Sequence, residues 1–382
     1  MDFLLNPSAN RDPLAPHQQR VVSLNAAREA LSEMQRWPGY APTPLRSLGS
    51  LAQRLGLREI SYKDESGRFS LGSFKALGGA YAAGCELRRR LHDRFAIEAS
   101  LADVFDGRHA TPLKSFTLCC ATDGNHGQSV AYAARRLGCS CVVFMHEHAP
   151  ESKATAIRSL GADVRRTRGT YDDSVAIAQR EVARNPTWIL IADTSTAEFE
   201  QIPAEVIQGY GVMVLEILSQ LKDPRTLSHV FVQGGVGGLA AAIAGTLAEA
   251  FGMRRPTLIV VEPITAACLM ESARRGRAAS VGGDLRTNME MLSCGMASPI
   301  AWTILAQKAD AFLTITDEAA ARAMRELCAG VAVGTPIDVG CSGAAGVAGL
   351  TEVSQSESLR EQLNLTADSH VLVFGTEAGA SP

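Results

Sequence analysis

The 382-residue chain lacks the short signatures of several common protein classes. None of its nine cysteines stands in a CxxC pair, so a zinc site is not favoured and buried, reduced thiols are expected. Cys268 and Cys294 are the first pair to test for a disulfide bond. The first residues lack the charged head and long apolar middle of a signal peptide. We therefore predict a cytoplasmic protein without a metal site.

Concentrated charge of one sign is also missing. The net charge is −3, and Lys and Arg are scattered along the chain without forming a basic stripe, which argues against a nucleic-acid partner. There is no basic amphipathic segment for a membrane surface. The apolar stretch 230–248 approaches membrane-spanning length, but Gln233 and four glycines near its start predict a strand, a turn and a helix. We predict no membrane partner.

The chain does contain enough apolar residues, 46%, for a substantial core. From Phe116 onward, short apolar strands alternate with helical segments, which predicts an α/β fold with open, mostly parallel sheets flanked by helices. Ligands of such sheets bind beyond the carboxyl ends of the strands. Residues 1 to about 20 are expected to form a polar arm, and residues 92–115 an irregular insertion.

One lysine stands at the head of a helix made of small and apolar residues. Lys75 follows Phe74 and precedes the run 76–83, whose alanines and glycines favour close packing. A lysine in this position either extends its amine to solvent or is held in place for chemistry. The sequence around it therefore decides between the two.

Glycine-bearing turns follow two of the predicted strands. Residues 234–238 allow several main-chain N–H groups to point at one anion, although their spacing is neither GxGxxG nor a P-loop, and a tight packing turn is the alternative. In residues 123–127, Asn125 can hydrogen-bond a ring hydroxyl and Asp123 can act as an acid or base; ordinary turn residues are the alternative. Asp193 follows another strand and has the same two interpretations.

Together these features supply an amine nucleophile, a turn that contacts a ring and a cradle for a phosphate. That set is typical of an enzyme dependent on pyridoxal 5′-phosphate (PLP).

With these residues laid out, the chain resembles the diaminopropionate ammonia-lyases, which are fold-type-II PLP enzymes related to the tryptophan synthase β subunit. The resemblance covers nearly the whole chain, and the Asp that precedes Gly-Asn-His is its most telling feature. The matching stretches include Lys63–Phe69, Phe74–Gly79, Ala121–Gly127, Tyr171–Asp173, Asp193–Thr194, Gln208–Tyr210, Gly235–Gly237, Val261–Pro263, Leu292–Gly295, Ser342–Ala344 and Thr376–Glu377. The chain departs from the family pattern in the loop 195–199 and at Cys341.

The resemblance implies a Schiff base between PLP and Lys75. Proton transfer then needs positioned acid–base groups, and our hypothesis is that Lys75, Asp123 and Asp193 serve as these groups, with Lys75 and Asp123 each taking the proton of one enantiomer. The resemblance further implies that 2,3-diaminopropionate is cleaved to pyruvate and ammonia by a homodimer. It also implies cofactor contacts by Phe74, Asn125, Gly234, Gly235, Val236, Gly237, Gly238 and Thr376.

We expect two domains with the cofactor in a cleft. The larger is predicted to comprise residues 1–85 and 205–382, and the smaller inserted domain residues 86–204. Two alternatives stay open. One is a serine or threonine dehydratase-like lyase acting on another β-substituted amino acid, and the other is a protein that binds PLP without turnover.

Overall fold

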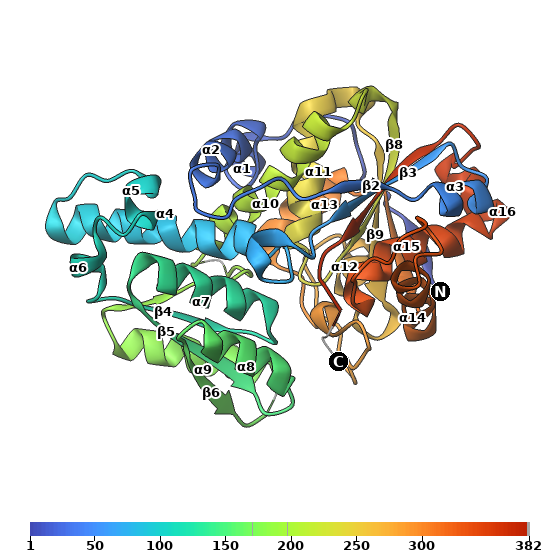
Figure 1. Cartoon of the computed structure of the whole chain (residues 1–382). Helices are drawn as coiled ribbons and strands as arrows, with labels where there is room; N and C mark the ends of the chain where they lie inside the picture. Colours follow the sequence, from blue (N-terminus) through green and yellow to red (C-terminus); the bar gives the residue numbers. More distant parts are fainter. Residues whose placement is uncertain (170, 197, 380–382) are drawn as a thin grey trace. The chain divides into compact units, whose positions relative to one another are not determined.

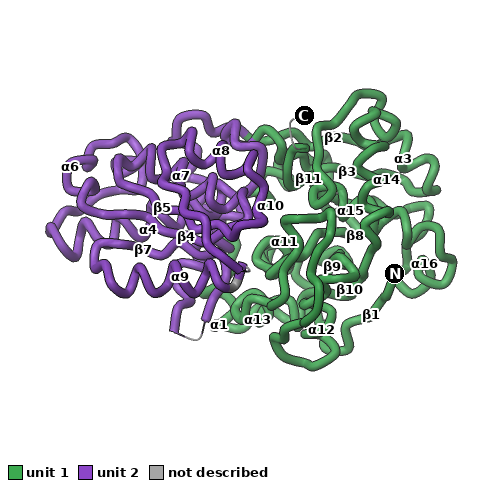
Figure 2. The backbone as a smooth tube through the Cα atoms, turned by 90° about the horizontal axis from the view of Figure 1, so that it is seen from below, with its two compact units in different colours: residues 1–24, 42–67, 213–382 green, residues 25–41, 68–212 purple. Residues whose placement is uncertain are grey.

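The computed structural model describes residues 1–169, 171–196 and 198–379. It contains two compact units, which Figure 2 draws in different colours. Unit 1 consists of residues 1–24, 42–67 and 213–382, and unit 2 of residues 25–41 and 68–212. The domain limits expected from the sequence stay a prediction.

Unit 1 is built on a seven-stranded sheet with the order β1-β10-β9-β8-β11-β3-β2. The five inner strands pair in parallel, and the two edge strands β1 and β2 are antiparallel to their neighbours. In chain order the strands are β1 (Phe3–Leu5), β2 (Leu45–Ser47), β3 (Glu59–Asp64), β8 (Leu227–Gln233), β9 (Thr257–Pro263), β10 (Ala311–Ile315) and β11 (His370–Gly375). The last strand of the chain, β11, therefore lies inside the sheet between β8 and β3 (Figure 1).

The core of unit 1 follows from the two-residue period of its strands. Ile259 and Val261 of β9 and Val371 and Val373 of β11 enter one buried cluster, and Ala344 of the helix α15 joins them. These strand residues share one face of the sheet because alternate side chains of a strand point to the same side. Helix α15 covers this face and packs against α14 (Figure 1). The helices of this unit are α1 (Pro16–Gln19), α3 (Gly49–Leu55), α11 (Gly238–Phe251), α12 (Cys268–Arg275), α13 (Pro299–Lys308), α14 (Asp317–Cys328), α15 (Cys341–Ser354) and α16 (Glu357–Leu363).

Unit 2 contains a parallel four-stranded sheet with the order β6-β5-β4-β7. Its strands are β4 (Thr117–Ala121), β5 (Ser140–His146), β6 (Asp163–Thr167) and β7 (Trp188–Leu190). Its helices are α2 (Leu24–Met34), α4 (Ala76–Phe95), α5 (Leu101–Phe105), α6 (Ala110–Leu113), α7 (Asn125–Leu137), α8 (Glu151–Ser159) and α9 (Tyr171–Arg184). The boundary between the units falls within α10 (Gln201–Gln220). The predicted α/β class with mostly parallel sheets is confirmed.

Two segments differ from their predictions. The start of the chain is not only an arm, because Phe3–Leu5 forms β1 and pairs with Ala311–Leu313 in β10. The stretch 92–115 is not irregular, since α4 continues to Phe95 and two short helices follow it. Ser100 caps the first of these by accepting a hydrogen bond from the N–H of Asp103.

The apolar stretch 230–248 forms the end of β8, a turn and most of α11, as predicted. Judged by length and composition alone, one helix among the described residues, α10, could cross a membrane. Its most apolar window is 78% buried inside the structure, which is the pattern of a core helix.

Candidate active site

Lys75 stands directly before α4, as the sequence predicts. Its Nζ donates a hydrogen bond to Asp193 Oδ2 at 2.6 Å and lies 5.4 Å from the ring centre of Phe74. The ring of Tyr210 is 5.9 Å away. The Lys75 side chain is 20% exposed, so the amine is held by a carboxylate and two rings and does not extend freely into solvent. Of the two expectations for this lysine, the geometry fits a held amine better than one that extends into solvent.

Small residues in α4 make room for Tyr210. A Cβ on Gly78 would lie 2.4 Å from Tyr210 Cε1, and a Cβ on Gly209 would lie 2.0 Å from the carbonyl oxygen of Leu77. Only glycine permits this close approach of the two helices. The small-residue run after Lys75 therefore sets the position of one wall around its amine.

Asp193 follows β7 and forms the acidic side of this group. Burial opposes its ionisation, but the charges of Lys75 and His126 outweigh burial and hold the pKa of the Asp193 carboxyl well below its usual range. Burial lowers the pKa of the His126 imidazole, whose Nε2 lies 2.8 Å from the carbonyl oxygen of Ile191. Asp193 is thus a carboxylate at neutral pH.

Asp123 follows β4, the strand next to β7 in the sheet. Its Oδ1 lies 3.0 Å from Nε2 of His146, the last residue of β5 on the other side of β4. The carboxyl ends of three neighbouring parallel strands therefore present His146, Asp123 and Asp193 along one edge. This edge contains two carboxylates and an imidazole, which are acid–base groups.

Asn125 is the first residue of α7 and is 4% exposed. Its Oδ1 accepts a hydrogen bond from Lys153 Nζ at 2.8 Å. The lysine stem lies against Gly124, where an added Cβ would come within 2.8 Å of Lys153 Cγ. The amide predicted to contact a cofactor ring is thus oriented by a lysine of α8.

In unit 1, the glycine turn joins β8 to α11. Gly237 has a φ of 100° and is the N-cap residue of α11. It has no side chain that could accept a hydrogen bond from the first N–H groups of the helix. A Cβ on Gly234 would lie 2.6 Å from Leu269 Cδ1 and from Val260 Cγ1. Four of the five residues 234–238 therefore present main chain without a side chain, which is the composition of an anion site.

Thr376 follows β11, the parallel neighbour of β8. Its Oγ1 accepts a hydrogen bond from Gln233 Nε2 at 3.2 Å, and Gln233 immediately precedes the glycine turn. The structure thus brings Thr376 and the predicted phosphate cradle to the same sheet edge of unit 1.

Cys268 and Cys294 both lie beside Gly235. The Cys268 thiol is 3.4 Å from the Gly235 carbonyl oxygen, and a Cβ on Gly235 would lie 3.0 Å from Cys294 Sγ. All nine cysteines lie in the described residues and none of them forms a disulfide. In the same described part of the chain, no cluster of three or more His, Cys, Asp or Glu could hold a metal ion.

Comparison with known proteins agrees with this geometry. Residues 36–376 match the family model described as pyridoxal-phosphate dependent enzyme. The chain is 38% identical over 370 residues to the diaminopropionate ammonia-lyase of Salmonella typhimurium, an alignment that covers 95% of this chain and 91% of that protein. The chain belongs to the diaminopropionate ammonia-lyase family of PLP-dependent enzymes.

Solved structures of this family match the whole fold. The Escherichia coli diaminopropionate ammonia-lyase in complex with an aminoacrylate–PLP azomethine reaction intermediate is 33% identical with a TM-score of 0.87. The same enzyme in complex with D-serine is 32% identical with a TM-score of 0.85. Each alignment covers 99% of this chain and 93% of the solved one. The resemblance and the fold-type-II class predicted from the sequence are confirmed.

Three residues that lie near the predicted site have no role predicted from the sequence. His146, Lys153 and Tyr210 contact predicted site residues, but none of them was predicted to act there. His146 ends a predicted strand, so the rule that ligands lie beyond strand ends could have found it. Nothing near Lys153 in the sequence indicates its contact. In the loop that departs from the family pattern, residue 197 lies outside the described residues.

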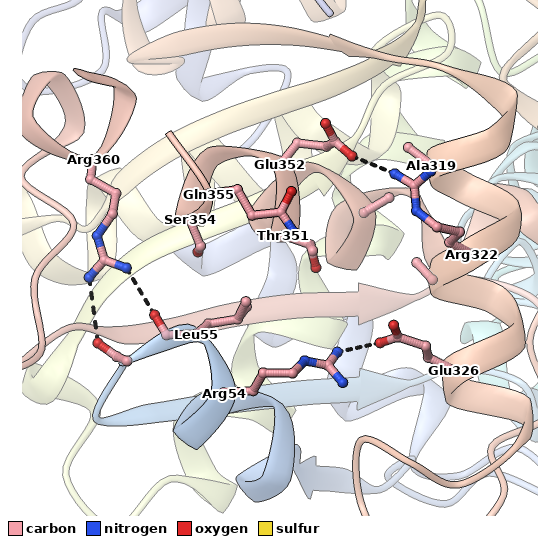
Figure 3. Close-up of a pocket in the computed structure, with 13 residues that line it drawn as sticks. Arg54, Leu55, Ala319, Arg322, Glu326, Thr351, Glu352, Ser354, Gln355 and Arg360 are labelled. Carbon is pink, nitrogen blue, oxygen red and sulfur yellow. Dashed lines mark hydrogen bonds and ion pairs between the residues drawn. The ribbon is translucent and has the colours of Figure 1, made fainter. Parts of the chain in front are cut away.

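A separate pocket of about 670 Å³ lies in unit 1 (Figure 3). Arg54 pairs with Glu326 across it, and Arg322 donates to Glu352 at 2.8 Å. The thirteen residues that line it include none of the predicted site residues. This pocket is therefore distinct from the candidate active site.

Proposed function

We propose that this chain is a PLP-dependent ammonia-lyase that cleaves 2,3-diaminopropionate to pyruvate and ammonia. The observation that carries the proposal is the group in unit 2, where the amine of Lys75 contacts a carboxylate and the strand ends present two more acid–base side chains. The diaminopropionate ammonia-lyases that the chain resembles along nearly its full length support the choice of substrate.

The residues present fit PLP in both units. Lys75 offers an amine to an aldehyde, and Asn125 offers an oriented amide for a ring hydroxyl. The glycine turn offers uncapped N–H groups to a phosphate, and a side chain at Gly234 would clash with its neighbours. We propose that Lys75, Phe74, Asn125, Gly234, Gly235, Val236, Gly237, Gly238 and Thr376 hold the cofactor.

When bound, PLP supplies an electron sink for the negative charge that develops at Cα. The protein must remove the Cα proton and release the β-amino group as ammonia. We assign the proton of one enantiomer to Lys75 and that of the other to Asp123. Asp193 is ionised, so it can attract the ammonium group of the substrate side chain and can assist its departure.

A substrate panel tests the proposal. Purified protein supplied with PLP is expected to release pyruvate from 2,3-diaminopropionate far faster than from serine, threonine or β-chloroalanine. A preference for serine or threonine would identify a dehydratase. Cofactor binding without product from any member of the panel would identify a PLP-binding protein that does not catalyse.

The proposal extends to assembly and location. We propose a homodimer, as the resemblance implies. We also propose a cytoplasmic location and no nucleic-acid or membrane partner, as the cysteines, the N-terminal residues and the scattered charge indicate. One chain has a mass of 40.5 kDa, and analytical ultracentrifugation of the PLP-loaded protein is expected to give twice this mass. A monomer at all concentrations would contradict the assembly.

A further inference from the structure

We propose that His146 is a positioning residue for Asp123, which it orients as a base for one substrate enantiomer. The inference rests on the proposed function, because it deepens the role given to Asp123. The carrying observation is the distance of 3.0 Å between His146 Nε2 and Asp123 Oδ1. The His146 side chain is 19% exposed and that of Asp123 25%, so water screens this contact less than it screens a surface pair.

The sheet places this imidazole beside the carboxylate. His146 is the final residue of β5, and Asp123 comes two residues after the end of β4, its parallel neighbour. The partner strands bring both side chains to the same edge. The contact therefore depends on strand register and not on a flexible loop.

The main chain around His146 is also fixed. Arg166 of β6 donates hydrogen bonds to the carbonyl oxygens of His146 and Ala149 at 3.0 and 2.8 Å, and a further one to Glu151 at 2.6 Å. The ring of His148 lies 6.2 Å from that of His146 at 61°. A positioned donor is most effective when its own conformation is held in this way.

The chemistry follows from the two carboxylate oxygens. An Nε2–H that faces Oδ1 at 3.0 Å attracts this oxygen and so fixes the orientation of the Asp123 carboxyl, although the pair lacks the alignment of a full hydrogen bond, and this leaves Oδ2 to accept the Cα proton. The proton moves from carbon to Oδ2, and the imidazole keeps its own proton. His146 therefore acts only through Asp123 and is not a catalytic residue itself.

Kinetics on separate enantiomers test the proposal. His146→Phe is expected to lower kcat about twofold to fivefold on the enantiomer that needs Asp123, which is the range for losing a polar contact that is not an aligned hydrogen bond. KM and turnover of the other enantiomer should change little. His146→Gln keeps an N–H donor and is expected to restore part of kcat. The matched control is His92→Phe, which removes another histidine 3.0 Å from an aspartate, at an exposed position of unit 2.

A second measurement needs no cofactor and no turnover. The ¹⁵N chemical shifts of His146 in the unloaded protein report which ring nitrogen carries the proton. We expect Nε2–H in the wild type and a changed tautomer population in Asp123→Asn. An Nδ1–H tautomer that Asp123→Asn leaves unchanged would overturn the inference.

The kinetic outcomes separate the two proposals. If the wild type turns over neither enantiomer, the proposed function fails, while the ¹⁵N measurement still decides on the contact. If the wild type is active and His146→Phe slows both enantiomers equally, or neither, the role of His146 is wrong and the proposed function stands.

Discussion

The two sheets offer different chemistry at their carboxyl ends. In unit 2 the strand ends carry ionisable side chains, and His146, Asp123 and Asp193 stand on three neighbouring strands. In unit 1 the turn after β8 is mostly glycine, and Leu269 and Val260 leave no space for a side chain at Gly234. The proposed acid–base groups thus belong to unit 2 and the proposed anion site to unit 1. Substitutions in unit 2 should change reactivity, and those in the glycine turn should change binding.

The largest effect is expected from Lys75→Ala. Without the amine, PLP has no covalent attachment point and one enantiomer has no base, so pyruvate release should fall by at least about 10³-fold. Borohydride reduction followed by peptide mass spectrometry should find PLP on Lys75 in the wild type only. If the Ala variant keeps substantial activity, unit 2 does not supply the reactive amine, and the proposed difference between the two units is wrong.

Asp123→Asn is expected to have the next largest effect. Its amide cannot accept a proton as a base, so turnover of one enantiomer should fall about 10²-fold or more while the other changes much less. The readout is pyruvate release from each pure enantiomer at saturating PLP. Equal losses on both enantiomers would contradict the division of labour between Lys75 and Asp123.

Gly234→Ala tests whether the glycine turn of unit 1 binds the cofactor. Its Cβ would crowd Leu269 and Val260 at 2.6 Å, and overpacking of this kind costs about 1–3 kcal/mol. We expect a lower melting temperature and about tenfold weaker PLP binding in a fluorescence titration. The control is Gly49→Ala in α3, where a Cβ would contact nothing within 4 Å. PLP affinity unchanged in Gly234→Ala would show that the turn does not hold the cofactor.

The last prediction concerns the stability of unit 1 and not turnover. Burial raises the pKa of Glu262 to about 8, against the hydrogen bonds it accepts from the N–H groups of Leu269 and Met270. The folded protein therefore binds this proton more readily than the unfolded chain, whose carboxyl has a pKa near 4.5. The stabilisation is complete below that pH and is lost as pH rises towards 8.

Glu262→Gln should flatten this dependence. Between about pH 5 and 8, the free energy of unfolding measured in urea should fall less in the variant, by roughly 3 kcal/mol. Exposed Glu357→Gln serves as the control and should keep the wild-type slope. A variant slope equal to that of the wild type would show that Glu262 does not titrate in this range.

Regular alternation made most of the fold predictable. The strands around 141–145 and 230–232 are apolar runs bounded by turn residues, and the structure contains both. The pairing of Phe3–Leu5 with β10 was not predictable, because three residues carry little periodicity and their partner lies some 300 positions away. The two short helices within 92–115 were missed because such segments form mainly through tertiary contacts.

The candidate site was predictable where its chemistry has a sequence signature. Lys75 and the glycine turn stand at recognisable junctions of strand, turn and helix, and family membership supports this interpretation. Lys153 was not predictable, because its contact with Asn125 depends on how α8 lies beside the start of α7. The contact between His146 and Asp123 depends in the same way on strand register, which a single sequence does not give.

The interior position of β11 has a consequence for synthesis on the ribosome. The strands of unit 2 have all been translated by residue 190, but β2 and β3 must wait for residues 370–375 before they can join the rest of their sheet. For most of translation this pair has an open edge, which is the kind of surface that chaperones shield. A nascent chain released before residue 370 would therefore lack the strand that joins the first part of its sheet to the remainder.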